Sequence, residues 1–333
     1  MPRPERPLRF RGPEGHALSG VLRPAEASPE AGAAEGAGAS GEANVEAPGP
    51  AVLFAPGNGF PVQAYGPALA GLPPDVTVHA LDPRSLGPAA AAAAGNGAAL
   101  ARLSDWGALL ADLRAYVEQR MQPPVILAGH SMGAMLALRL AAEAPALVAG
   151  LLLLEPPLRV RRGQPLSPEA AAGGRAFVER TRGRRAAWAA REEAAAWFAG
   201  SVSYRLWHAE ARAAFVAHGL VAAPQGGVRL ATPPELEAAL YETVPRQELF
   251  AWAARARCAG VLLRGRESAA ADVAALEELA DALPVGVVIP VPGSHAFPME
   301  HPAETGLRMA AALRLLRGET GLALTPVESG RTG

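Results

Sequence analysis

The sequence places a serine between two glycines, Gly129-His130-Ser131-Met132-Gly133, in a pattern typical of a catalytic nucleophile. A serine hydroxyl is a weak nucleophile until a neighbouring base removes its proton. It must also project toward a substrate. A sharp strand-to-helix turn achieves this when glycines two residues before and after the serine relieve the crowding. We therefore predict that Ser131 attacks an acyl group.

A histidine that could serve as the base follows the last predicted strand. His295 lies in the loop Gly293-Ser294-His295, directly after the apolar segment 285–291. Its position near the end of the chain allows the order serine, acid, histidine that one large group of such triads uses. The other histidines lack this placement and are interpreted as surface, packing or capping residues: His16, His79, His130, His208, His218 and His301.

The carboxylate that would orient His295 has two candidates. It must hold the imidazole in the correct tautomer and stabilise its protonated form. Glu155 ends the predicted strand 150–154 and precedes two prolines, so it stands at the carboxyl edge of the sheet, where ligands bind in such folds. Glu267 follows the predicted strand 261–263. We favour Glu155, and Glu267 remains the alternative.

The oxyanion that forms during acyl transfer needs N–H donors close to Ser131. The free amides and positive dipole end of the following helix make the Met132 N–H one candidate. A second donor should come from a loop after an earlier strand. The glycines of the loop Gly57-Asn58-Gly59 permit close backbone approach, so we expect the Asn58 N–H to donate, with Gly59 as the alternative.

The elements that must position these residues can be read from hydrophobic periodicity. Short apolar runs alternate with amphipathic segments, which indicates a mainly parallel sheet with helices on both faces. Strands are predicted over 7–11, 17–22, 51–54, 76–81, 125–128, 150–154, 261–263 and 285–291. Helices are predicted from an N-cap at Ser104 to 117, from Ser131 to 143, over 273–283 and over 302–317, while residues 88–99 are expected to be irregular.

One block interrupts the alternation of strands and helices. Residues 158–254 have helical composition and no convincing strand, so we predict an α-helical cap inserted into a core of residues 1–157 and 255–318. Residues 29–50 are almost wholly Ala, Gly, Glu and Pro and are predicted to be a flexible insert, and 319–333 a disordered tail. The aromatic residues of the block are interpreted as the core of the cap: Phe177, Trp188, Trp197, Phe198, Trp207 and Phe215.

Taken in order along the chain, these motifs resemble those of the α/β-hydrolase superfamily over nearly the whole length. The segment 54–60 looks like its oxyanion loop, 129–133 like its nucleophile elbow and 293–295 like its histidine loop. The resemblance implies the α/β-hydrolase fold, with a mainly parallel sheet flanked by helices and an inserted cap.

Two positions depart from the superfamily pattern. Pro56 stands where the oxyanion loop usually has histidine, and Ser268 stands at the usual position of the acid. Some cap-bearing relatives, the haloalkane dehalogenases and related enzymes, are similar in carrying the acid where Glu155 stands. Those dehalogenases use an aspartate nucleophile, so Ser131 argues against their chemistry here.

Composition excludes several classes of protein. A formal net charge of −1 gives no basic footprint for nucleic acid, and no apolar run is long enough to cross a membrane. The single cysteine, Cys258, cannot form an internal disulfide, and no apolar signal segment follows Met1. No histidine/cysteine cluster or dinucleotide fingerprint is present. We therefore expect a cytoplasmic protein without metal or organic cofactor.

The expected function is hydrolysis of a small carboxylic ester or related acyl bond through an acyl-enzyme, with an apolar acyl group in the substrate. The arginines between Arg159 and Arg191 could attract an anionic substrate but are interpreted as a solvated helix face. The same fold could serve acyl transfer, carbon–carbon bond hydrolysis, lyase chemistry or cofactor-free oxidation. A non-catalytic ligand-binding or interaction protein is a further alternative, and the oligomeric state is left open.

Overall fold

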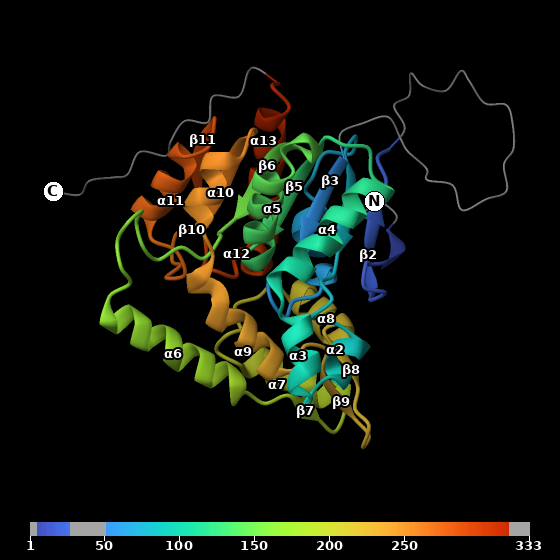
Figure 1. The fold of residues 1–333 in the computed structure, drawn as a ribbon. Helices are drawn as coiled ribbons and strands as arrows, with labels where there is room; N and C mark the ends of the chain where they lie inside the picture. Colours follow the sequence, from blue (N-terminus) through green and yellow to red (C-terminus); the bar gives the residue numbers. More distant parts are fainter. Residues whose placement is uncertain (1–4, 27–50, 320–333) are drawn as a thin grey trace, which may run out of the picture.

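The computed structural model describes residues 5–26 and 51–319, which form a mainly parallel sheet with helices packed on both faces (Figure 1). The predicted flexible insert 29–50 and residues 320–333 of the predicted tail lie outside the described residues. The sheet has eight strands in the order β1-β2-β4-β3-β5-β6-β10-β11. β2 pairs antiparallel with β1 and β4, and the other neighbouring strands are parallel. This architecture confirms the predicted fold class.

All eight predicted strands are present, and their ends differ from the prediction by at most two residues. They are β1 (Arg6–Arg11), β2 (Ala17–Arg23), β3 (Ala51–Ala55), β4 (Thr77–Leu81), β5 (Val125–His130), β6 (Val148–Leu154), β10 (Ala259–Gly265) and β11 (Gly286–Val291). The core helices are α1 (Gly66–Leu69), α4 (Trp106–Arg120), α5 (Met132–Glu143), α11 (Val273–Asp281), α12 (Phe297–Glu300) and α13 (Pro302–Leu316), with 3-10 turns η2 (Val62–Tyr65) and η3 (Pro145–Leu147).

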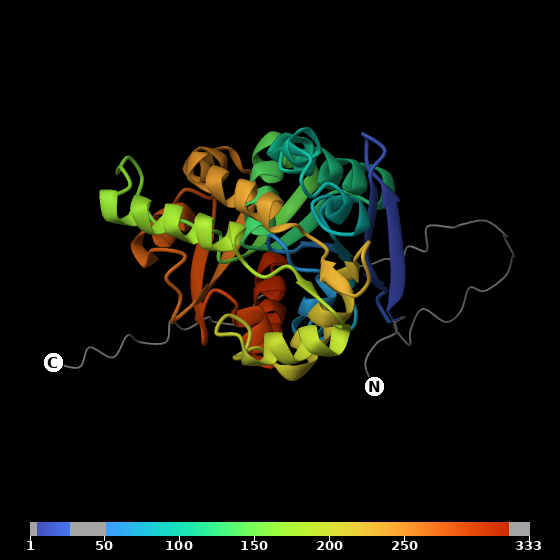
Figure 2. The same cartoon turned by 90° about the horizontal axis from the view of Figure 1, so that it is seen from below.

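Successive side chains of the central strands enter two different hydrophobic layers, because strand residues point alternately to opposite faces. Leu53 and Leu127 pack in one buried cluster with residues of α4, α5 and α11. Val52 and Ile126 pack in the other, with residues of α1 and α13. In Figure 2 the red helix α13 lies on the opposite side of the sheet from the green α5. The central strands are therefore buried on both faces, which accounts for their continuous apolar sequences.

Two local predictions between β4 and β5 were wrong. Residues 88–99 are not irregular, because α2 (Pro88–Ala92) and α3 (Gly97–Leu103) form there, and the Asn96 side chain caps α3 by accepting from Ala99 N at 3.1 Å. Ser104 is not the N-cap of α4. Asp105 takes that position, and its carboxylate accepts from Ala108 N at 2.7 Å. Both side-chain types cap helices well, so composition alone does not choose between adjacent residues.

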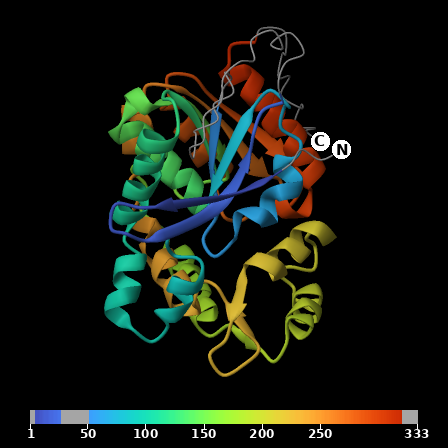
Figure 3. The same cartoon turned by 90° about the vertical axis from the view of Figure 1, so that its right-hand side faces the viewer.

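The segment 158–254, which we call the cap, lies below the sheet in Figure 3. Its helices are α6 (Pro168–Arg182), α7 (Arg191–Gly200), α8 (Ala209–His218), α9 (Pro234–Thr243) and most of α10 (Leu249–Arg255), with the 3-10 turn η4 (Val244–Arg246). The expectation that it holds no strand was wrong, because β7 (Ala187–Trp188), β8 (Leu220–Ala222) and β9 (Val228–Leu230) form a small antiparallel sheet. Strands of two or three residues are too short to show a period-two pattern.

The aromatic residues of the cap form its interior, as predicted, with one exception. Trp188, Phe198, Trp207 and Phe215 are buried and pack against one another through tilted and edge-to-face contacts. Phe177 is 42% exposed. Large aromatic surfaces buried in one cluster stabilise a small subdomain efficiently, and here that cluster is continuous with the apolar layer between the sheet and α1 and α13.

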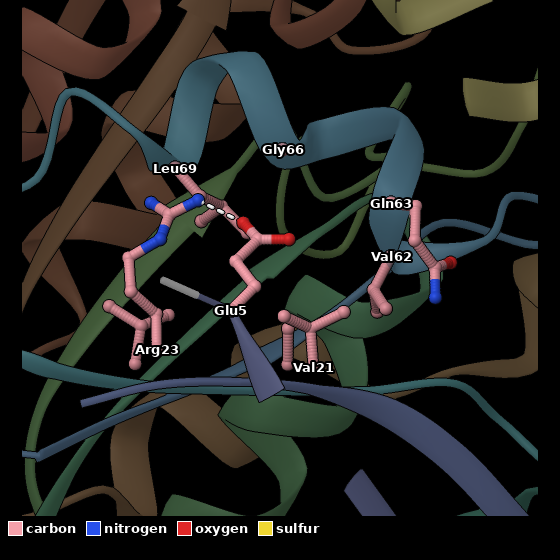
Figure 4. Close-up of a pocket in the computed structure, with 9 residues that line it drawn as sticks. Glu5, Val21, Arg23, Val62, Gln63, Gly66 and Leu69 are labelled. Atoms are coloured by element: carbon pink, nitrogen blue, oxygen red, sulfur yellow. Dashed lines mark hydrogen bonds and ion pairs between the residues drawn. The ribbon is translucent and has the colours of Figure 1, made fainter. Parts of the chain in front are cut away.

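A small surface pocket lies between β2, β4 and the η2–α1 segment, where an ion pair joins Arg23 to Glu5 (Figure 4). Its lining contains none of Ser131, Glu155 or His295. It is lined by Glu5, Val21, Arg23, Val62, Gln63, Gly66, Leu69, Val78 and Ala80. Among the residues of 5–26 and 51–319, no helix is both long and apolar enough to cross a bilayer.

Replacing Gly133 by alanine should destabilise the fold, because α5 meets β3 without space for a side chain. An added Cβ would lie 2.0 Å from the backbone oxygen of Ala55. We expect Gly133→Ala to lower the free energy of unfolding, measured in urea, by at least about 2 kcal/mol. Gly173→Ala in α6 is the control. There the added Cβ meets no atom within 4 Å, so stability should rise by about 0.5–1 kcal/mol. Wild-type stability for Gly133→Ala would contradict the close helix–strand approach.

Candidate active site

Ser131 lies at the sharp turn between β5 and α5, in a backbone conformation that non-glycine residues rarely adopt. Its φ is 53° and its ψ −115°, and its amide donates to Leu154 O at 2.9 Å. The flanking glycines make the turn possible, since a Cβ at Gly129 would lie 2.4 Å from the carbonyl carbon of Gly133. The strand, turn and helix expected around Ser131 are therefore all present.

His295 contacts the Ser131 hydroxyl directly. Its Nε2 lies 3.0 Å from Ser131 Oγ, which is within hydrogen-bond reach. The loop that carries His295 is held by hydrogen bonds from its backbone, because Ser294 N donates to Glu300 Oε2 at 2.7 Å and Gly293 N donates to Glu267 Oε2. The His295 side chain is 31% exposed, so the ring can be reached from solvent.

Glu155 lies behind the His295 ring at the end of β6. Its side chain is fully buried, and its Oε2 is 3.8 Å from His295 Nδ1 and accepts from Gly265 N at 3.1 Å. Glu155 Oε1 and His295 Nδ1 are both buried and have no hydrogen-bond partner among the described residues. The two groups face each other at slightly more than hydrogen-bond length, a looseness that is common in catalytic pairs without substrate.

Glu267, the alternative acid, contacts the histidine loop by a different route. Its carboxylate accepts from the backbone N–H of Gly293, while Glu155 lies near the His295 ring. Ser268, at the position where relatives of this fold usually have the acid, accepts through its Oγ from Ala270 N at 3.1 Å. The two candidate acids therefore differ in what they contact: Glu155 lies beside the His295 ring, and Glu267 binds the backbone of the histidine loop.

The loop after β3 and the first residue of α5 come together beside Ser131. Met132 begins α5, and Gly59 has a φ of 78°, which suits glycine. The Asn58 side chain is buried and donates from Nδ2 to Glu237 O in the cap at 2.9 Å. The cap therefore holds this loop through Asn58, and the chain leading into the loop lies against the start of α5, where an added Cβ at Gly133 would be 2.8 Å from Pro56 O.

Sequence reasoning missed a buried network that joins the Gly57 loop to the histidine loop. Gly57 N donates to the Tyr65 hydroxyl at 3.0 Å, and that hydroxyl lies 2.8 Å from His130 Nδ1. His130 Nε2 lies 2.8 Å from His295 O. A carbonyl can only accept, so His130 Nε2 carries the proton and the Tyr65 hydroxyl donates to Nδ1. Every polar atom of this hydrogen-bond network then has a partner.

His130 is fully buried and stays neutral. Burial and the charge that His295 can carry hold the pKa of His130 well below its usual range, although the bond to His295 O opposes this. The sequence interpretation of His130 as a packing residue was therefore incomplete. Its place directly before Ser131 was the available signal, whereas nothing in the sequence around Tyr65 pointed to a partner for it.

The cap covers the Gly57–Phe60 loop with both apolar and polar groups. The Phe60 ring packs on Trp207 with centroids 5.3 Å apart. The buried carboxylate of Glu237 lies beside Gly59, where an added Cβ would be 3.4 Å from Glu237 Cδ. Arg184 pairs with Glu237 at 3.1 Å. No group of histidine, cysteine and acidic residues that could hold a metal ion occurs within 5–26 and 51–319.

Several solved structures share this architecture. E-2-(acetamidomethylene)succinate hydrolase is 19% identical, with a TM-score of 0.68 over 93% of this chain and 99% of that one. A peroxisomal alpha-beta-hydrolase from Saccharomyces cerevisiae is 16% identical, with a TM-score of 0.67 over 96% and 90%. N-formylmaleamic acid deformylase from Pseudomonas putida is 16% identical, with a TM-score of 0.61 over 92% and 100%. At these identities the likeness extends to the fold.

A search of curated protein sequences gives no match. The family model described as "Alpha/beta hydrolase family" matches residues 52–305, a stretch that begins in β3 and ends inside α13 and so contains the Ser131 turn and the His295 loop. This match covers most of the sequence, and the strand order and the strand–turn–helix at Ser131 agree with it. The chain belongs to the alpha/beta hydrolase family.

Proposed function

We propose that the protein is a serine hydrolase that cleaves a small carboxylic ester or a related acyl bond through an acyl-enzyme. The observation that supports this proposal most directly is the 3.0 Å separation of Ser131 Oγ and His295 Nε2 at the end of β5. A nucleophile and a base within hydrogen-bond reach are the minimum for covalent acyl transfer.

In the proposed reaction Ser131 Oγ attacks the carbonyl carbon of the substrate while His295 Nε2 takes the hydroxyl proton. The tetrahedral intermediate collapses when His295 returns that proton to the leaving group, which departs and leaves Ser131 acylated. Water then repeats the sequence, with His295 as base, and releases the acid. The Asn58 and Met132 amides are the proposed donors to the oxyanion, with Gly59 as the alternative to Asn58.

Glu155 is the proposed acid of the triad. Its buried carboxylate lies 3.8 Å from His295 Nδ1, whereas the carboxylate of Glu267 accepts from the backbone N–H of Gly293. A carboxylate at Nδ1 keeps the proton there, leaves Nε2 free to accept from Ser131, and stabilises the imidazolium that forms.

The substrate is proposed to be a small molecule with an apolar acyl group. The same mechanism cleaves an ester or an amide bond. Two of the similar structures carry names of enzymes that act on amide-containing acids: E-2-(acetamidomethylene)succinate hydrolase and N-formylmaleamic acid deformylase. Their names favour including amide bonds among the candidate substrates.

The first test is turnover of an activated ester such as para-nitrophenyl acetate. Wild-type protein should hydrolyse it with a burst of para-nitrophenol, and Ser131→Ala should fall to the solution background because the acyl-enzyme cannot form. Circular dichroism of both proteins controls for folding. Equal background rates in two folded proteins would favour a non-catalytic ligand-binding role. Product trapping by an added alcohol would separate acyl transfer from hydrolysis.

The second test compares the two carboxylates. Glu155→Gln should lower kcat by about a hundredfold to ten-thousandfold, because the amide cannot stabilise the imidazolium and can impose the wrong tautomer. Glu267→Gln keeps a hydrogen-bond acceptor for Gly293 N and should lower kcat less than about tenfold. The reverse ranking of the two variants in steady-state assays would assign the acid to Glu267.

The third test concerns the Tyr65–His130 network. Tyr65→Phe leaves Gly57 N and His130 Nδ1 without their buried partner, so the free energy of unfolding should fall by about 1–3 kcal/mol. We also expect a lower kcat, since both loops beside Ser131 lose their link. Tyr116→Phe is a matched control, because its hydroxyl lies 2.8 Å from His79 Nδ1, away from Ser131. A similar kcat in both variants would refute a positioning role for Tyr65.

A further inference from the structure

Two tyrosines of the cap pack against a largely buried ion pair formed by an arginine and a glutamate. Arg184 Nη1 donates to Glu237 Oε1 at 3.2 Å and to the Tyr204 hydroxyl at 3.3 Å, and the Tyr241 hydroxyl donates to Glu237 Oε1 at 3.4 Å. We call Arg184, Tyr204, Glu237 and Tyr241 the cap polar cluster. The Glu237 side chain is 4% exposed and that of Arg184 is 22% exposed. Burying such a pair is costly, because removing both charges from water is only partly repaid by their attraction.

The cap polar cluster lies directly on the loop that carries the proposed oxyanion donors. Asn58 Nδ2 bonds to the backbone of Glu237, and an added Cβ at Gly59 would lie 3.4 Å from Glu237 Oε1. Arg184 therefore reaches this loop indirectly: it contacts Glu237, and Glu237 contacts the loop. This loop follows β3, which pairs with the Ser131 strand β5, so the cap polar cluster lies over the same end of the sheet.

Arg184 has unused hydrogen-bonding capacity. Its bonds to Glu237 and Tyr204 all run from Nη1, and within 5–26 and 51–319 no partner occurs for Nε or Nη2. These two nitrogens form the edge of the guanidinium that binds a carboxylate through two parallel hydrogen bonds. Arg182, two residues earlier, differs because it is exposed and pairs with both Glu179 and Glu242.

The neighbours of Arg184 also keep its positive charge in place. Burial lowers the pKa of the Arg184 guanidinium, but the neighbouring Tyr204, Glu237 and Tyr241 groups outweigh burial and raise it, so Arg184 stays charged. Burial raises the pKa of the Glu237 carboxyl, and the attraction of Arg184 offsets this only in part.

We propose that the cap polar cluster binds a carboxylate group of the substrate through the Nε–Nη2 edge of Arg184, so that the protein prefers acyl substrates that carry an acid group. This inference rests on the proposed function, since it assumes that the bond to be cleaved lies at Ser131. The half-buried Phe60 side chain would contact the carbon chain between that bond and the carboxylate. The arginine-rich segment thus contains one arginine placed to recognise substrate among others on the solvated face.

The experiment measures a ratio of kcat/KM for two pairs of substrates. One pair is the para-nitrophenyl monoester of adipic acid and its neutral methyl-capped counterpart; the other is 4-acetoxybenzoate and its methyl ester, which place the acid group on the leaving side. In at least one pair the wild type should favour the charged member. Arg184→Gln should lower that preference by about tenfold to a hundredfold, the range of a charge-assisted hydrogen bond.

Two further variants separate recognition from general damage. Arg180→Gln removes an exposed arginine of α6, the helix that ends two residues before Arg184, and should leave the preference within about twofold of the wild type. Glu237→Gln removes the competing carboxylate while keeping an acceptor for Arg184, so it should raise the preference for the charged member. An unchanged preference in Arg184→Gln, or equal losses for the charged and neutral members, would overturn the proposal.

A binding measurement keeps the inference testable if turnover is absent. Adipate should raise the melting temperature of Ser131→Ala, and should do so less in the double variant Ser131→Ala/Arg184→Gln. If no ester is turned over but this protection is present, the proposed function fails and the anion site stands. If esters are turned over by the wild type without any preference for the charged members and adipate gives no protection, the proposed function stands and the anion site fails.

Discussion

The arrangement of the site depends on how two neighbouring parallel strands end. His130 pairs in register with Leu154, so the residues that follow them, Ser131 and Glu155, leave adjacent strands at the same edge of the sheet. These are the two non-glycine residues with positive φ within 5–26 and 51–319, at 53° and 45°. Such backbone conformations cost about 1–3 kcal/mol each unless the surroundings hold them. Here backbone bonds do so, from Ser131 N to Leu154 O and from Glu155 N to Leu263 O.

The remaining parts of the site follow from that shared edge. β3 and β10 are the neighbours of β5 and β6 in the sheet, so the Gly57 loop and the Gly265 turn reach the same place. The Tyr65–His130 bridge ties the Gly57 loop to the histidine loop across the face of β5. The site is therefore assembled from the ends of β3, β5, β6, β10 and β11, the last of which precedes the His295 loop. Its precision comes from main-chain bonds between segments far apart in sequence.

Sequence patterns predicted the parts of this site that are local. The elbow glycines, the apolar run before them and the small-residue helix after them all lie within a few residues of Ser131. The strands on which Glu155 and His295 depend, β6 and β11, likewise end within a few residues of them. What the sequence could not supply were contacts between distant segments. Nothing in the sequence marks Tyr65 and His130 as partners, because the hydrogen bonds to Gly57 and His295 exist only in the folded chain. Likewise Arg184 belongs to a run of exposed arginines, and only the packing of α9 against α6 buries it beside Glu237. The short strands of the cap were missed because two or three residues carry no periodicity.

The buried carboxylate of Glu155 is best understood through the charge that the proposed reaction creates. A fully buried carboxylate with one backbone donor and one unpaired oxygen is poorly compensated in the resting protein. It gains a partner when His295 takes the proton of Ser131, since the imidazolium then stands within a few ångströms in a site with little water to screen it. His130 cannot compete for that proton, because it is buried, neutral and already donates to His295 O. In this view the position of Glu155 after β6 stabilises the charged state of His295 more than its neutral state, which is the condition for lowering a barrier and not only for binding.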